Sequence, residues 1–325
     1  MNASRLTFGI YPLGVAGTPT GLAVGPKDDY AQIQSALRDL RGETNVVLPR
    51  NYMIYTGPAS TAKLQSIAET YLHNGQLGDL TIGCMQTPDI DLPGWLEFVR
   101  TLIRQYGVHL ASLQITNEPN LTFMEGSKPY VLQALVEGVL AAKREARELD
   151  LPLHIGFGSV PESPVALPHF WERLAELGGN DFVNAIDFVG HNFYVDVFEE
   201  PLDLKDIPAS VERTLRDLRE KHLVAAGIPA AVPIRVTENG WPTGRNPFVQ
   251  AERSYERQAA VLETVIRTVD RLREELHITQ YVLFGLRDAD SSKDDLFHQF
   301  GIVRDDYSPK PAYDTFKRLI RELGN

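Results

Sequence analysis

The sequence has almost no cysteine and no long apolar run. Of its 325 residues only Cys84 is a cysteine, so an internal disulfide is excluded and a reducing compartment fits. No stretch approaches the ~20 apolar residues that a membrane-spanning helix needs. The first residues contain one arginine and no sustained apolar segment, which is unlike a signal peptide. We therefore expect a cytoplasmic protein.

Positive charge is also scarce. The chain has 32 Lys and Arg against 43 Asp and Glu, a net charge of −11 and a pI near 5.3. Such a surface repels phosphate groups, so we expect no nucleic-acid partner and no binding to an anionic membrane. Hydrophobic residues make up 43% and charged residues 23%, as in soluble globular proteins, which excludes a disordered, collagen-like or coiled-coil chain. The oligomeric state stays open.

Short apolar runs alternate with amphipathic segments about every 40 residues, which is the pattern of strands followed by helices. The expected strands are Leu6–Tyr11, Asn45–Leu48, Leu80–Cys84, Ser112–Thr116, Leu153–Gly158, Ala185–Phe193, Pro233–Thr237 and Gln280–Leu286. The expected helices are Asp28–Leu40, Ser60–Tyr71, Leu92–Tyr106, Lys128–Leu149, Pro168–Leu177, Ala209–Ala226, Ala251–Leu276 and Pro311–Leu323. The strands are apolar on both faces, which is typical of a parallel sheet covered by helices.

Eight strands alternating with eight helices predict a (β/α)8 TIM barrel, and we expect one domain over residues 1–325. An open doubly wound sheet is the alternative. The glycine fingerprint of dinucleotide binding is missing from the first strand–helix turn, because Gly14, Gly17, Gly21 and Gly25 are spread out among prolines. The barrel is therefore the better prediction.

Two expected strands end in a glutamate. The fourth strand leads into Asn117-Glu118-Pro119 and the seventh into Thr237-Glu238-Asn239-Gly240. Catalytic groups of a barrel lie at the carboxyl ends of its strands, so we expect the two glutamates to face each other across the barrel. One protonated and one ionised carboxyl group is the pair that cleavage of a glycosidic bond requires.

These motifs resemble those of the clan A retaining glycoside hydrolases. Asn117-Glu118-Pro119 is similar to the clan's acid/base motif, and Thr237-Glu238-Asn239-Gly240 to the nucleophile motif of family 1 β-glycosidases. The segment from Glu238 to Thr243 also resembles family 17 β-1,3-glucanases, so the exact family stays open. Residues 187–194 and 300–313 are similar to the sixth-strand and last strand-to-helix segments of clan members.

The resemblance implies a retaining β-glycosidase that acts on β-linked glycosides or oligosaccharides by double displacement. Glu118 would be the acid/base and Glu238 the nucleophile, with carboxyl groups roughly 5–5.5 Å apart. Transglycosylation at the same site and a catalytically silent carbohydrate-binding barrel are the alternatives. The sugar, the linkage and exo or endo action are not indicated by the sequence.

Further residues at the strand ends are candidates for supporting roles. The resemblance implies that Arg50 orients the nucleophile and that Tyr194 donates a hydrogen bond to it. The other candidates for contact with the sugar or with the catalytic pair are Asn117, His191, Asn192, Trp241, Gln86, Tyr11 and Phe284. Aromatic rings stack on the C–H faces of sugars, and Phe284 stands where the clan usually has a tryptophan.

We expect no cofactor and no metal. Asp294, Asp295 and His298 have a spacing that is weak support for a metal site, and a polar loop is the better interpretation. A Schiff-base aldolase needs a lysine near a strand end, whereas Lys63 and Lys128 open helices.

Overall fold

The computed structural model describes residues 5–18, 21–64, 77–246, 249 and 253–325. Eight parallel strands form a closed barrel in the order β1-β10-β9-β8-β7-β6-β5-β4. These strands are β1 (Thr7–Tyr11), β4 (Val47–Tyr55), β5 (Gly78–Cys84), β6 (Leu110–Ile115), β7 (His154–Phe157), β8 (Phe188–Asn192), β9 (Ile234–Asn239) and β10 (Ile278–Phe284). The predicted (β/α)8 barrel is confirmed, and the open sheet is excluded.

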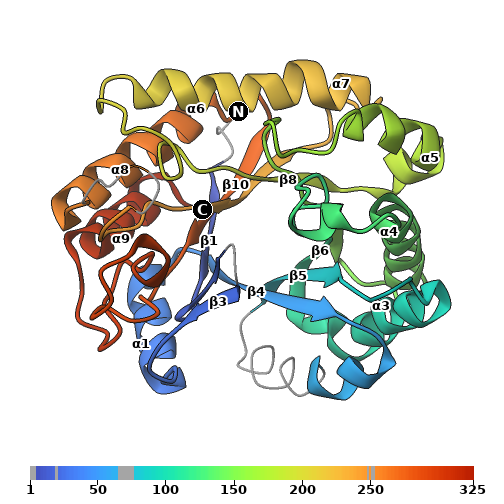
Figure 1. Ribbon diagram of the computed structural model, residues 1–325, viewed down its shortest axis with the longest axis horizontal. Coiled ribbons are helices and arrows are strands. Elements are labelled where there is room, and N and C mark those ends of the chain that lie inside the picture. Colours follow the sequence, from blue (N-terminus) through green and yellow to red (C-terminus); the bar gives the residue numbers. More distant parts are fainter. Residues whose placement is uncertain (1–4, 19–20, 65–76, 247–248, 250–252) are drawn as a thin grey trace. The chain divides into compact units, whose positions relative to one another are not determined.

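The chain forms two compact units, whose boundaries along the sequence fall within β4, after β8, after α6 and within β9. The first unit is Met1–Pro49, Phe193–Arg216 and Val236–Asn325, and the second is Arg50–Asn192 and Asp217–Arg235. Helices α3 and α4 pack together in the second unit, and α8 and α9 in the first (Figure 1).

The helices follow most of the expected segments. They are α1 (Tyr30–Arg41), α3 (Leu92–Tyr106), α4 (Val131–Glu148), α5 (Phe170–Ala185), α6 (Ile207–Arg216), α7 (Leu223–Ala225), α8 (Tyr255–Leu272) and α9 (Pro311–Leu323). A π-helical stretch, Asp217–His222, separates α6 from α7 within the expected helix Ala209–Ala226. Residues 65–76, which include part of the expected helix Ser60–Tyr71, lie outside the described residues.

Helix α3 shows why the periodic segments fold as predicted. The Asp91 carboxylate caps its first turn by accepting from the Gly94 N–H at 3.1 Å. Its buried face is made of Trp95, Phe98, Val99, Leu102, Ile103 and Tyr106, at helical spacing. The Trp95 indole also donates to the Ala134 carbonyl of α4 at 3.0 Å, so the burial of this tryptophan leaves no unpaired polar group.

Two segments in the first 55 residues differ from the prediction. Strand β4 was expected to stop at Leu48, but it continues to Tyr55 and carries Arg50 in its interior. The glycine-rich segment after β1 was not expected to contain strands, yet it forms a hairpin of β2 (Val15–Thr18) and β3 (Gly21–Val24). Residues 19–20, between the two strands in the sequence, lie outside the described residues.

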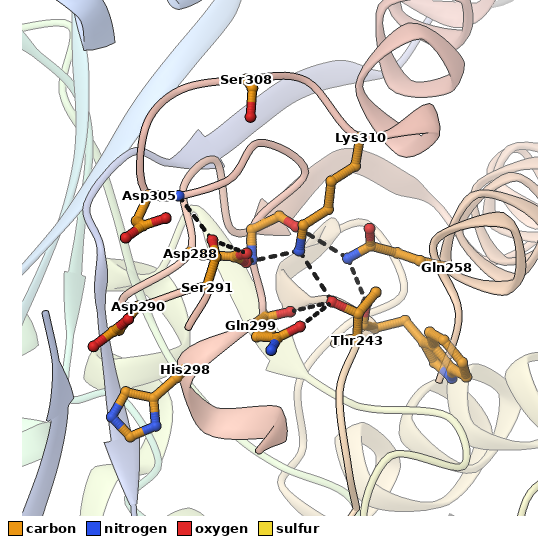
Figure 2. A network of polar contacts seen from close by, with 12 residues as sticks. Thr243, Gln258, Asp288, Asp290, Ser291, His298, Gln299, Asp305, Ser308 and Lys310 are labelled. Carbon is orange, nitrogen blue, oxygen red and sulfur yellow. Dashed lines mark hydrogen bonds and ion pairs between the residues drawn. The ribbon is translucent and has the colours of Figure 1, made fainter. Parts of the chain in front are cut away.

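A buried polar network in the first unit joins the loops after β9 and β10 to the start of α9 (Figure 2). The Lys310 ammonium lies 2.8 Å from Asp288 Oδ1 and donates to Thr243 Oγ1 at 3.1 Å, and both charged side chains are fully buried. Asp288 also accepts from the Gly301 N–H and the Ser291 hydroxyl. The network therefore ties the loop that follows Glu238 to the rest of the first unit.

We predict that Lys310→Met lowers the free energy of unfolding by about 3–5 kcal/mol, because it leaves the Asp288 carboxylate buried without its counter-ion. Chemical denaturation measures the change. Lys317→Met, on the helix α9 that Lys310 directly precedes, is the matched control, since the Lys317–Asp39 pair is exposed. It should cost less than about 1 kcal/mol. Equal losses in the two variants would contradict this interpretation of the network.

Candidate active site

Glu118 lies in the second unit, three residues beyond the end of β6, with 9% of its surface exposed. The Asn192 side-chain amide, at the end of β8, donates to Glu118 Oε1 at 3.1 Å and to Asn117 Oδ1 at 3.1 Å. Both partners are oxygen atoms, so the group of Asn192 that faces them is its NH₂ donor. Asn192 therefore holds the Glu118 side chain and the preceding residue together, so it contacts one of the two predicted glutamates.

The turn that carries Glu118 begins in a strained conformation. Thr116 has a φ of 65°, a region that β-branched residues rarely adopt. The Thr116 N–H donates to the Ile82 carbonyl of β5 at 2.7 Å, and the Gln114 side chain donates to the Thr116 carbonyl at 2.8 Å. These contacts hold the strained residue. Strain of this kind clusters at functional sites, where the surrounding structure maintains it.

Glu238 lies in the first unit as the penultimate residue of β9 and is 8% exposed. The Tyr194 hydroxyl donates a hydrogen bond to Glu238 Oε1. The Phe193 N–H donates to the Glu238 carbonyl at 3.0 Å, so adjacent residues hold the backbone and the side chain of the glutamate. The hydrogen bond from Tyr194 is the contact that the resemblance implied.

Aromatic rings surround Tyr194 in the first unit. Its ring packs edge-to-face against Phe300, with centroids 5.8 Å apart, and against Phe198, at 5.6 Å. Phe300 in turn contacts Phe284 at 5.3 Å, and Phe284 stacks on Tyr11 at 4.9 Å. Phe198 is 43% exposed. An apolar wall with one open ring therefore lies beside Glu238.

A small cavity borders this wall. Tyr11, Phe284, Phe297, Phe300 and Arg287 are among the residues that line it. Tyr11 and Phe284 were predicted as sugar contacts, and their place at the cavity keeps that prediction open. Phe198, Phe297 and Phe300 were not predicted as site residues, because single aromatic residues in loops carry no periodic signal.

Arg50 does not lie at a strand end as expected. It is fully buried in the interior of β4, where its guanidinium donates to Asp79 at 3.0 Å and to Gln114 at 2.9 Å. Asp79 also accepts from the Ser112 hydroxyl at 2.8 Å. The polar side chain was taken as the end of the strand, but these partners on β5 and β6 satisfy it inside the barrel. Its predicted role in orienting the nucleophile stays a prediction.

Trp241 is not an open platform for a sugar. It is 3% exposed, its indole donates to Asp196 at 2.5 Å, and the Arg253 guanidinium lies 4.5 Å from the ring centre. Gln86 is partly exposed, and its side-chain oxygen accepts from the Asp91 N–H at 2.8 Å at the start of α3. Trp241 is therefore a packed core residue, and the sugar contact of Gln86 stays a prediction.

His191 is buried beside Ser159 in the second unit, 1% exposed, and so is not placed as an open sugar contact. The Ser159 hydroxyl donates to the Gly190 carbonyl at 2.8 Å and lies 2.9 Å from His191 Nδ1. Because that hydroxyl proton is already used, Nδ1 carries the proton of the ring and donates it to Ser159. Burial lowers the pKa of His191 to about 3, with a smaller contribution from His222.

Two further properties concern only the described part of the chain. None of its helices has both the length and the apolar character to cross a membrane. Over the same residues, no group of three or more His, Cys, Asp or Glu is arranged to hold a metal ion.

The closed barrel of eight parallel strands is a fold that the chain shares with solved structures of glycoside hydrolases. The chain is similar to the family 1 β-glucosidase from Thermotoga maritima, with a TM-score of 0.61, 14% identity and 99% of each chain covered. It is also similar to the family 17 β-1,3-glucanosyltransferase from Rhizomucor miehei, with a TM-score of 0.55 and 15% identity over 94% of this chain and 96% of that one.

A family 39 glycoside hydrolase from Bacteroides cellulosilyticus gives a TM-score of 0.55 and 17% identity, over 99% of this chain and 64% of that one. No protein-family model matches the sequence. No curated protein matches it either. At these identities the likeness establishes the fold, which is the one that the sequence resemblance implied.

We predict that His191 stays neutral in the folded protein down to about pH 4. In the unfolded chain it titrates near 6.5, so its contribution to stability is complete above pH 6.5 and is lost as the pH falls toward 3. Between pH 7.5 and 5 the free energy of unfolding should fall by about 2 kcal/mol through this residue.

Urea unfolding of the wild type and of His191→Asn at both pH values measures this contribution, because the variant should lack that part of the slope. His169→Asn is the control, since His169 is exposed and asparagine tolerates its positive φ of 55°. An identical pH slope in wild type and His191→Asn would show that folding does not lower the pKa of His191.

Proposed function

We propose that this protein is a retaining glycoside hydrolase that cleaves β-linked glycosides or oligosaccharides. Glu118 is its acid/base and Glu238 its nucleophile. One observation carries the proposal: each strand-end glutamate is held by a donor from the end of β8 or the residues after it, Asn192 for Glu118 and Tyr194 for Glu238. The similar solved structures support it, since their descriptions are those of β-glucosidases and other glycoside hydrolases.

The first step forms a covalent glycosyl-enzyme. A carboxylate oxygen of Glu238 attacks the anomeric carbon, the bond to the leaving oxygen breaks, and the Glu118 proton goes to that oxygen. Since Asn192 donates to Oε1 of Glu118, the acid proton is placed on Oε2. The Tyr194 hydroxyl stabilises the ionised form of Glu238 and fixes its rotamer.

The second step releases the sugar with its configuration retained. Glu118, now ionised, takes a proton from water, and the oxygen of that water attacks the anomeric carbon and displaces Glu238. The aromatic residues beside Tyr194 fit a sugar substrate, because rings stack on the C–H faces of pyranoses. This mechanism requires the two carboxyl groups to lie roughly 5–5.5 Å apart.

Transfer to a sugar in place of water is the second candidate. It shares the covalent intermediate, and one similar structure is described as a β-1,3-glucanosyltransferase. Added acceptor sugars separate the two reactions, since a transglycosylase forms longer products and a hydrolase releases the free sugar. The presence of both glutamates with their hydrogen-bond donors disfavours a silent binding barrel.

We predict that Glu238→Gln lowers kcat/KM by at least about 1,000-fold on whichever substrate the wild type cleaves, and that Glu118→Gln does so on substrates whose leaving group must be protonated, such as oligosaccharides. A panel of aryl β-glycosides and of β-1,3- and β-1,4-linked oligosaccharides finds that substrate. Glu176→Gln, an exposed residue of α5, is the control and should keep full activity.

Small anions then distinguish the two roles, because azide replaces a missing carboxylate. Azide should rescue Glu118→Ala with a β-glycosyl azide as product and Glu238→Ala with an α-glycosyl azide. The opposite anomers would reverse the assignment, and an active Glu238→Gln variant would exclude this nucleophile.

We also predict that Tyr194→Phe lowers kcat/KM by about 10–100-fold, because the charged acceptor loses its hydrogen bond. The variant keeps the ring contacts with Phe198 and Phe300, so its thermal midpoint should stay within a few degrees of the wild type. Tyr313→Phe, which removes a tyrosine–carboxylate bond to Asp39 elsewhere in the first unit, is the control. Unchanged kinetics in Tyr194→Phe would leave this bond without a role.

A further inference from the structure

A third buried glutamate lies close behind the acid/base segment in the second unit. Glu125 begins a short 3₁₀ turn, Glu125–Ser127, in the loop between β6 and α4, and is 3% exposed. The mechanism above gives it no part. Carboxylates are rarely buried unless they are paired or hydrogen-bonded, so its contacts need an explanation.

The Glu125 carboxylate joins the ends of two strands through backbone N–H groups. Its Oε1 accepts from the N–H of Asn117 at 2.7 Å, and its Oε2 accepts from the N–H of Cys84 at 3.3 Å. Cys84 is the last residue of β5, and Asn117 directly precedes Glu118. One side chain therefore connects the end of β5 to the segment that carries the acid/base.

The surrounding backbone leaves room for this carboxylate and little else. A Cβ on Gly83 would lie 2.5 Å from Glu125 Oε1. A Cβ on Gly126 would lie 2.6 Å from the Leu121 carbonyl and 2.8 Å from the Pro119 carbonyl. Glycine at both positions lets the loop fold back tightly, so that Glu125 reaches the residues before Glu118.

We infer that Glu125 is a positioning residue, which holds the Asn117–Glu118 segment in place through its two backbone hydrogen bonds. The inference rests on the proposed function, because it gives Glu125 its role through Glu118. Asn117 also binds the Asn192 side chain, so the segment is held from the backbone side by Glu125 and from the side-chain side by Asn192.

The charges around Glu125 agree with two N–H donors as the partners of its carboxylate. Among the described residues, no Lys, Arg or His forms an ion pair with Glu125. Burial raises the pKa of Glu125 to about 7, and the hydrogen bonds from Asn117 and Cys84 partly oppose that rise. The titratable groups beside it are the Cys84 thiol and the Tyr130 hydroxyl, whose pKa values are raised by burial and further by the charge of Glu125.

Two other charged side chains act on the pKa values of Cys84 and Tyr130. Lys128 opposes the rise in the pKa of Cys84, and Asp89 adds to the rise in the pKa of Tyr130. The two N–H donors favour the ionised form of Glu125, whereas burial favours its neutral form. Glutamine at this position keeps the shape but turns one of the two acceptors into a donor that faces an N–H group.

Kinetics with two leaving groups test the inference. A poor leaving group, such as an alkyl alcohol or a second sugar, needs the proton of Glu118, whereas dinitrophenolate leaves without it. For Glu125→Gln we expect kcat/KM to fall by about 10–100-fold on the poor leaving group and by less than about 3-fold on the dinitrophenyl glycoside. Equal losses on both substrates, or no loss on either, would overturn the inference.

Glu145→Gln is the matched control. Glu145 is also buried in the second unit, but its carboxylate pairs with Arg104 between α3 and α4. This variant should lower stability without a change in the ratio of kcat/KM between the two substrates. If it changes the ratio as Glu125→Gln does, general loosening of the unit explains the effect and the inference fails.

Amide hydrogen exchange gives a readout that does not depend on activity. In Glu125→Gln the amides of Asn117 and Cys84 should exchange about 10-fold faster or more, and those of α4 should not change. Unchanged exchange at both amides would show that the carboxylate does not hold them. Faster exchange in Glu125→Gln, together with a wild type that cleaves nothing on the panel, would confirm the contact and reject the proposed function with the role drawn from it.

Discussion

The whole structure depends on the closed ring of parallel strands. Closure gives every barrel strand a hydrogen-bonded neighbour on both sides, so the barrel itself has no open strand edge. Parallel pairing also gives each strand end a loop that is free to carry chemistry, while the strand itself stays rigid. The ends of β6 and β9 carry Glu118 and Glu238, and the end of β8 and the residue two beyond it carry their hydrogen-bond donors. Asn192 and Tyr194 are two residues apart in the sequence, and each donates a hydrogen bond to one of the two glutamates.

Buried polar groups connect barrel strands to one another and hold the loops that follow them. In the second unit, Arg50 and Asp79 form an ion pair inside the barrel, and Glu125 binds the backbone before Glu118. In the first unit, Lys310 and Asp288 join the loops after β9 and β10. Each group is costly to bury alone, so each is satisfied by several partners. The burial of these polar groups costs stability, and their hydrogen bonds give the strand ends a defined geometry.

Much of the fold could be predicted from the sequence, because buried parallel strands are runs of apolar residues and their helices have a clear period. The end of β4 could not, since Arg50 looks like a loop residue until Asp79 and Gln114 are known to lie beside it. The hydrogen bond from Tyr194 to Glu238 followed from the motif resemblance. The burial of Trp241 did not, because Asp196 and Arg253, which cover it, are far away in the sequence. Periodicity identifies faces, whereas partners of polar and aromatic loop residues depend on the tertiary structure.

The most direct test of the central claim is to trap the covalent intermediate. A 2-deoxy-2-fluoro β-glycoside with a good leaving group, matched to the sugar that the protein cleaves, reacts with a retaining enzyme and then hydrolyses slowly. Mass spectrometry of the digested protein locates the attached sugar. Our account predicts one fluorosugar per chain, bound as an ester to Glu238, and none in Glu238→Gln. Attachment to another residue, or turnover with no trapped ester, would contradict it.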